Sequence, residues 1–120
     1  MLSKTRILTV LLLCTGLLSC GPSDGAYVDH YPSGAIKEEG FYKEGQKSGR
    51  WRFYWKDGKT KVEGSYLKGE PHGTWTFNNK RGSVIATGTY RNGQMWDGQF
   101  VRYVLGTQKV IVVKEGQQAN

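Results

Sequence analysis

Residues 38–54 read EEGFYKEGQKSGRWRFY, and they decide the fold because three glycines stand among aromatic and charged residues. Trp51, Phe53 and Trp55 occupy every second position, with Arg52 and Tyr54 between them. Alternation of this kind is typical of a β-strand, whose successive side chains point to opposite faces of a sheet. The stretch therefore predicts strands with one aromatic face and one mostly polar face.

The same pattern returns with a period of 24 residues, which indicates a repeat protein. Three segments align without a gap: SGAIKEEGFYKEGQKSGRWRFY, DGKTKVEGSYLKGEPHGTWTFN and RGSVIATGTYRNGQMWDGQFVR. The positions that all three share are Gly34, Gly58 and Gly82; Gly40, Gly64 and Gly88; Tyr42, Tyr66 and Tyr90; and Gly45, Gly69 and Gly93. The third segment has Gln99 where the others have Trp51 and Trp75, so its second half is predicted to have degenerated.

The repeated glycines are predicted to have two different roles. Gly34 and its equivalents fall between strands and are predicted to form tight hairpins, because glycine adopts positive φ without strain. Gly45 and Gly49 are predicted to bracket the other, longer turn. Gly40 and its equivalents fall within a strand, where glycine costs stability unless a neighbouring ring needs the space. We therefore expect a Trp or Phe of the next strand to lie over each of them.

The predicted fold is all-β: an elongated, single-layer antiparallel meander built from hairpin repeats of 24 residues, spanning residues 27–114. The expected strands are 27–31, 35–43, 50–56, 59–67, 74–79, 83–91, 98–105 and 109–114. In the last hairpin, Val101, Tyr103 and Leu105 are predicted to keep the register of the repeats. Its apolar edge strand needs a cover or a partner, which leaves an edge-strand homodimer open. Residues 115–120 are expected to form a disordered tail.

The first residues predict an exported lipoprotein. A basic start is followed by a short apolar run and then by LLSC, residues 17–20, where small residues precede Cys20. This tetrapeptide resembles the lipobox of bacterial lipoproteins, which implies removal of residues 1–19 and acylation of Cys20. Residues 20–26 then form the lipidated cysteine and a short tether that holds the domain close to a membrane. We expect a place in the cell envelope, at the outer membrane rather than the inner one if the source has two, because Gly21 stands where a retention signal would have aspartate.

The repeat itself resembles the bacterial variant of the MORN repeat, whose units read Gly, any residue, Tyr, two residues, Gly, three residues, Gly, any residue, Trp. GFYKEGQKSGRW and GSYLKGEPHGTW match this pattern in full, and GTYRNGQMWDGQ matches it as far as Gly93. The resemblance covers about residues 30 to 103. It implies successive hairpins in one extended sheet, and it is similar to proteins described as membrane-associated, scaffolding or antitoxin modules.

The first functional hypothesis is a non-enzymatic, membrane-anchored protein-interaction or scaffolding module. Because a single sheet has no second layer, part of its aromatic stripe stays open unless the rings cover one another. The residues expected to contact an unidentified envelope protein are Trp51, Phe53, Trp55, Trp75, Phe77 and Tyr103.

The second hypothesis follows from the formal charge of +7: a basic face that binds anionic lipid or another envelope polyanion. The residues expected to carry it are Lys37, Lys43, Lys47, Arg50, Arg52, Lys56, Lys59 and Lys61. A third alternative, neutralisation of a partner protein as an antitoxin, is implied only by the resemblance.

Other classes of function find little support in the sequence. His72 falls at a turn and His30 at the first strand, and neither belongs to a nucleophile elbow, a phosphate loop or a zinc motif. We expect no catalytic residues, no metal and no cofactor. Nucleic acid is not an expected partner either, because an exported lipoprotein has little access to it and the aromatic residues follow the repeat period.

Overall fold

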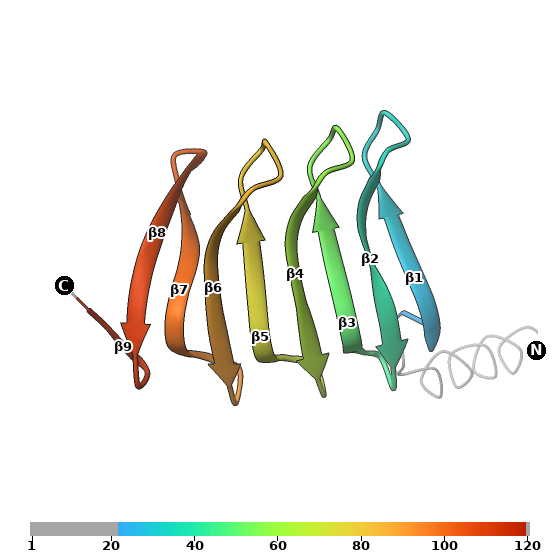
Figure 1. Ribbon diagram of the computed structural model, residues 1–120. Helices are drawn as coiled ribbons and strands as arrows, with labels where there is room; N and C mark the ends of the chain where they lie inside the picture. Colours follow the sequence, from blue (N-terminus) through green and yellow to red (C-terminus); the bar gives the residue numbers. More distant parts are fainter. Residues whose placement is uncertain (1–21, 120) are drawn as a thin grey trace, which may run out of the picture.

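The computed structural model describes residues 22–119 as one antiparallel sheet, in which every strand pairs with its neighbours in the sequence (Figure 1). Its strands are β1 (Gly25–His30), β2 (Ile36–Lys43), β3 (Gln46–Tyr54), β4 (Thr60–Leu67), β5 (Glu70–Asn78), β6 (Val84–Arg91), β7 (Gln94–Val104), β8 (Thr107–Lys114) and β9 (Gln117–Gln118). The predicted single-layer meander is confirmed. Across residues 22–119 there is no helix long and apolar enough to cross a bilayer.

The two kinds of turn are the reverse of those predicted. Glu44 and Gly45 alone connect β2 to β3, and their φ angles of 53° and 74° suit a two-residue hairpin turn of the type that follows the twist of the strands. At the opposite end of the strands, the loop that contains Gly34 spans residues 31–35 and is closed by a hydrogen bond from Tyr31 N to Ala35 O of 2.8 Å. We call the end with the longer loops the loop edge and the other end the turn edge.

Gly49, which was predicted to lie in a turn, lies within β3 in a β-bulge. The pairing of β2 with β3 passes from Glu39↔Arg52 to Phe41↔Ser48, so two extra residues are accommodated on β3. Gly49 has a φ of 65°, which glycine tolerates best. The bulge lets β3 begin at Gln46, four residues before its predicted start.

The expected covering of strand glycines is confirmed in all three repeats. A Cβ built on Gly40 would lie 2.6 Å from Cγ of Trp51, and one on Gly64 would lie 2.5 Å from Cγ of Trp75. In the third repeat the covering ring is Phe100, whose Cε2 would lie 2.6 Å from a Cβ on Gly88. The third repeat therefore keeps its ring, and the prediction that its second half has degenerated is wrong.

A change of register explains why the gapless alignment missed Phe100. The pairing of β6 with β7 passes from Thr89↔Asp97 to Tyr90↔Met95, so this bulge holds one extra residue instead of two. A slip of one residue moves every following side chain to the other face of a strand. Phe100 thus joins the aromatic face, and Tyr103 lies on the opposite one.

The ends of the domain differ from the prediction. β1 begins at Gly25, so the strand takes two residues from the expected tether. Residues 115–118 are not a disordered tail: Glu115 and Gly116 turn the chain back, and β9 pairs with Val113 and Lys114 of β8. The predicted signal peptide and Cys20 lie outside the described residues.

Candidate interaction surfaces

The aromatic face is covered by its own side chains. Trp51 has an exposed fraction of 0%, Trp75 of 5% and Phe77 of 7%. The ring of Tyr42 stands edge-on to Trp51 with 5.2 Å between centroids, and Tyr66 stands edge-on to Trp75 at 5.1 Å. Buried rings in this arrangement stabilise the sheet. They offer a partner little surface.

The indole N–H groups of this face are also satisfied internally. Trp51 Nε1 donates to the carbonyl oxygen of Phe41 at 3.2 Å, and Trp75 Nε1 donates to that of Ser65 at 3.2 Å. Each bond ties a covering ring to the strand that carries its glycine. The face therefore holds adjacent strands together.

An ion pair covers the first repeat on this side. Lys47 Nζ lies 4.0 Å from the ring centroid of Trp51 and 3.2 Å from Glu38 Oε2. Phe53, the remaining ring predicted for docking here, is half-buried, and the same ammonium lies 5.0 Å from its centroid. Phe53 therefore lies beneath a paired cation.

Trp55 and Tyr103 do not share this face, contrary to the prediction. β3 ends at Tyr54, and Trp55 lies in the loop that follows. Lys61 Nζ lies 4.6 Å from the Trp55 ring centroid and 4.5 Å from that of Tyr103, so the ammonium joins the two rings. Lys80 Nζ lies 5.8 Å from the Trp55 ring. We call Trp55, Lys61, Lys80 and Tyr103 the loop-edge site.

Hydrogen bonds between successive loops hold this site in place. Tyr31 Oη donates to Tyr54 O at 2.7 Å, and 24 residues further on Trp55 Nε1 donates to Asn79 O at 3.1 Å. Gln108 Nε2 donates to Asn78 O at 3.2 Å and to Tyr103 Oη at 3.3 Å. Each loop thus fixes its neighbour, and the rings are positioned before any partner arrives.

The electrostatics of the loop-edge site favour an anion. Burial lowers the pKa of Lys61, and the charge of Lys80 lowers it further. Neither ammonium belongs to an ion pair within residues 22–119, and Asp57, on the wall of the adjoining cavity, pairs with Lys59 at 3.7 Å. The cavity has a volume of about 440 Å³ and lies open to solvent. Its cations are therefore available to an acidic group from outside.

Comparison with known families explains the repeated geometry. A family model for the MORN repeat variant matches residues 23–44 and 47–68. This chain carries MORN repeats. The two matched units correspond to the hairpins β1–β2 and β3–β4, and β5–β6 repeats their arrangement. No curated protein and no solved structure matches the chain.

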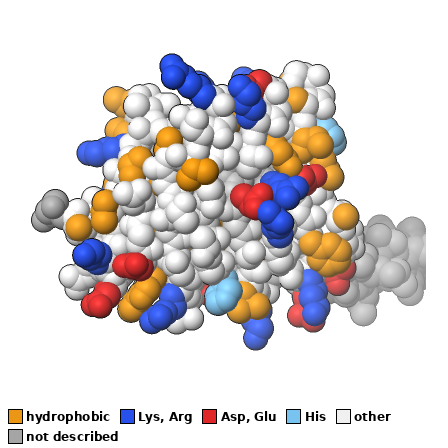
Figure 2. Space-filling view, in the orientation of Figure 1, with side chains coloured by type: hydrophobic (Ala, Val, Ile, Leu, Met, Phe, Trp, Pro, Cys, Tyr) orange, Lys and Arg blue, Asp and Glu red, His pale blue; other side chains and the backbone are white. Residues whose placement is uncertain are grey.

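The eight cations predicted to form one basic face are divided among the surfaces of the MORN sheet. Lys37 pairs with Asp29 at 3.3 Å, and Lys47 lies on the aromatic face. Arg50 and Arg52 both pair with Glu63 on the opposite face. Lys43 ends β2 at the turn edge. Only Lys56, Lys59 and Lys61 gather near the loop edge. Figure 2 shows charged side chains of both signs over the middle of one face, and Lys and Arg along its upper edge.

Lys80 and Arg81 of the loop edge were missed by the sequence reasoning. They lie in the loop between β5 and β6, at the positions that Lys56 and Asp57 occupy between β3 and β4. The two loops lie side by side, since a Cβ built on Gly82 would lie 3.7 Å from Cδ of Lys59. The repeat period contained the signal, because loop positions 24 residues apart stack in space.

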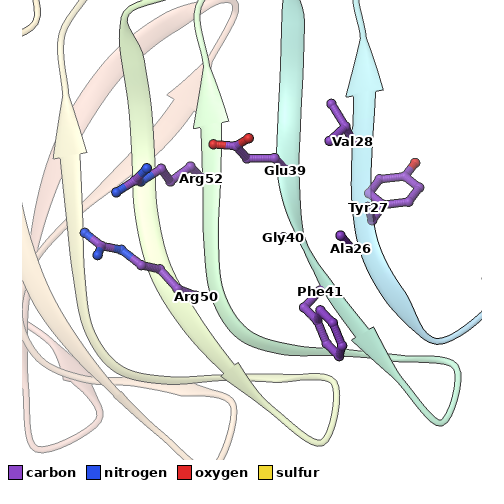
Figure 3. Close-up of a pocket in the computed structure, with 8 residues that line it drawn as sticks. All are labelled: Ala26, Tyr27, Val28, Glu39, Gly40, Phe41, Arg50 and Arg52. Atoms are coloured by element: carbon purple, nitrogen blue, oxygen red, sulfur yellow. The ribbon is translucent and has the colours of Figure 1, made fainter.

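A hollow of about 330 Å³ lies over β1, β2 and β3 (Figure 3). Val28 and Phe41 line it together with Glu39, while Arg50 and Arg52 extend from β3 toward β4. Both guanidinium groups are hydrogen-bonded to Glu63 there. The hollow is thus mainly an apolar depression beside a satisfied charge cluster.

The acidic residues and histidines do not gather into a metal site within residues 22–119. His30 and His72 are both exposed and lie on different strands, β1 and β5.

Proposed function

We propose that this MORN-repeat chain is a non-enzymatic, membrane-anchored envelope lipoprotein that acts as a protein-interaction module through its loop-edge site. The observation that carries the proposal is the meeting of Trp55 and Tyr103, 48 positions apart in the sequence, around the ammonium of Lys61. The covered aromatic face, by contrast, serves as the internal support of the sheet.

The chemistry of the loop-edge site suits a protein partner with an acidic surface. The centres of protein interfaces are enriched in aromatic side chains that are already held in position. Trp55 meets this condition because Asn79 fixes its indole, and Tyr103 because Gln108 holds its hydroxyl. Lys80 adds a cation beside the rings. Acidic side chains of a partner would pair with Lys61 and Lys80 while apolar groups cover the rings.

The direction of β1 places the site away from the proposed anchor. β1 starts at the turn edge with Gly25 and reaches the loop edge after His30 (Figure 1). A strand of this length spans roughly 20 Å. With lipid on Cys20, a sheet standing on the membrane would direct its loop edge outward, where another envelope protein is within reach.

The test is photo-cross-linking in intact envelopes with a photoreactive residue at Arg81. We expect a discrete cross-linked product that is lost in the double variant Trp55→Ala, Tyr103→Ala and retained in Phe41→Ala, which removes an exposed ring elsewhere. Thermal melting of each variant confirms that the sheet is intact. A product that is unchanged in the folded double variant would count against the loop-edge site.

A second candidate function, binding of anionic lipid or another envelope polyanion, is favoured by the cations of two adjacent loops. Lys56 and Lys59 lie beside Lys80 and Arg81, and only Asp57 opposes them within these loops. Flotation with phosphatidylglycerol vesicles tests it, with Lys80→Glu against the matched control Lys43→Glu. Binding that disappears between low and moderate salt only when Lys80 is intact supports this candidate; indifference to salt and to Lys80 rejects it.

A further inference from the structure

The closing hairpin of the sheet, formed by β7 and β8, carries a concentration of exposed apolar side chains. They are Tyr103, Val104, Leu105, Val110 and Val112. Apolar residues scattered singly over a surface need no explanation, but a group on one hairpin indicates an interaction surface. This group lies beside the C-terminal edge of the sheet.

Part of β8 presents an open backbone edge. Ala119 N donates to Val112 O at 2.9 Å, on the side of β8 that faces away from β7. Alternate residues of a strand direct their N–H and C=O groups to the same side, so Gln108 and Val110 also point outward. In the described part of the chain, β9 pairs only with Val113 and Lys114. The groups of Gln108 and Val110 therefore remain available for strand pairing.

The chain itself shows that this edge accepts a strand. β9 adds to the far end of β8 with the registers Val113↔Gln118 and Lys114↔Gln117. An incoming segment placed beside Gln108 and Val110 would continue the same line of pairing. Its side chains would alternate between Val110 on one face and Lys109 on the other.

The charges of the hairpin select the kind of segment. Lys109 is opposite Arg102 in the register of β7 with β8, so two exposed cations share one face beside the open edge. Neither has an ion pair within residues 22–119. In an antiparallel pair of β8 strands centred on Val110, the two copies of Lys109 would lie diagonally opposite, at roughly 7–8 Å. The edge thus disfavours a second copy of itself and favours acidic side chains.

We propose that the open edge of β8 at Gln108 and Val110 binds an extended, acidic segment of a partner protein by strand addition. Backbone hydrogen bonds supply the pairing, Lys109 and Arg102 select acidic side chains, and Val110 contacts apolar ones. This surface is separate from the loop-edge site, so the inference does not depend on the proposed function.

The experiment uses the full chain in lipid nanodiscs and an eight-residue peptide in which Val and Glu alternate, with a Val and Lys peptide as its counterpart. Amide hydrogen exchange is followed by NMR. The acidic peptide should slow exchange at Gln108 and Val110 at least tenfold, and the basic peptide should leave it unchanged. Equal protection by both peptides, or none by the acidic one, would overturn the proposal.

Two variants separate the backbone from the side chain. Val110→Pro removes an outward N–H without touching the β7 pairing, so it should weaken binding of the acidic peptide at least tenfold. Val110→Thr retains the N–H and should bind within about threefold of the parent. Unchanged binding by folded Val110→Pro would sink the idea, and the exchange measurement on the parent decides if that variant does not fold. Protection that grows with protein concentration alone would identify a second copy as the occupant instead.

Discussion

Replacing Gly64 by alanine should destabilise the sheet although alanine is the better strand residue. The new Cβ would lie 2.5 Å from Cγ of Trp75 and closer to two other ring carbons. Carbon atoms in contact prefer about 3.5 Å, so the indole has to retreat by roughly 1 Å or more. Trp75 is only 5% exposed and donates to Ser65 O, so the retreat disturbs packing and a hydrogen bond together.

The magnitude of this change follows from the two contributions. Overpacking a well-packed site costs about 1–3 kcal/mol, and the lost bond of Trp75 Nε1 adds roughly 1 kcal/mol. The reduced entropy of the unfolded chain returns about 0.4–1 kcal/mol. The net loss in the free energy of unfolding should therefore be roughly 2–3 kcal/mol, measured by urea unfolding followed by circular dichroism.

A double-mutant cycle decides whether the ring is the cause. In a Trp75→Ala background the space above Gly64 is free, so Gly64→Ala should be neutral or stabilising by up to about 1 kcal/mol. Gly34→Ala serves as a comparison, because no atom lies within 4 Å of its new Cβ and only its φ of 90° opposes the change. An equal loss from Gly64→Ala with and without the indole would refute the covering argument.

Three further predictions concern the register, the turns and the charges. Phe100→Ala should cost about 3–5 kcal/mol in urea unfolding, whereas Gln99→Ala, at the position that the gapless alignment equates with Trp75, should stay within about 0.5 kcal/mol. Glu44→Asn should raise stability by roughly 0.5–1 kcal/mol, because Glu44 has a φ of 53° and asparagine tolerates this region better; a lower melting temperature would contradict the turn assignment. Burial alone would raise the pKa of Glu63, but hydrogen bonds from Arg50 and Arg52 outweigh it and lower the pKa. The ionised form therefore stabilises the fold above the ordinary glutamate pKa of about 4.3, and the advantage of the parent over Glu63→Gln should shrink as the pH falls below it; a difference that stays constant down to pH 3 would exclude this cause.

The strands and the aromatic covering were predictable because each depends on local alternation. Trp51 and Phe53 mark one face of a strand whichever residues precede them, and Gly40 sits two positions before a repeated tyrosine. A ring was needed over that glycine on energetic grounds alone. The structure confirms this expectation at every repeat, including the one that ends with Phe100.

The turns were not predictable because the repeat places glycine near both ends of every strand pair. Only Asn92 and Gly93 show the dipeptide that is typical of a two-residue hairpin. At the equivalent place the first repeat has Glu44 before its glycine, and the backbone takes positive φ there against the preference of the residue. The number of residues in each bulge is likewise invisible in a period.

The place of Tyr103 shows how one bulge residue decides the candidate site. Had the third bulge held two extra residues, as in β3, alternation would have put Tyr103 on the aromatic face, as predicted. The shorter bulge sends it to the face where Lys61 already meets Trp55. The loop-edge site is therefore a product of register as much as of composition. Inserting one glycine between Trp96 and Asp97 should return Tyr103 to the aromatic face, displace Phe100 from Gly88 and abolish the loop-edge site, and NMR contacts between Tyr103 and Lys61 that survive the insertion would contradict this account.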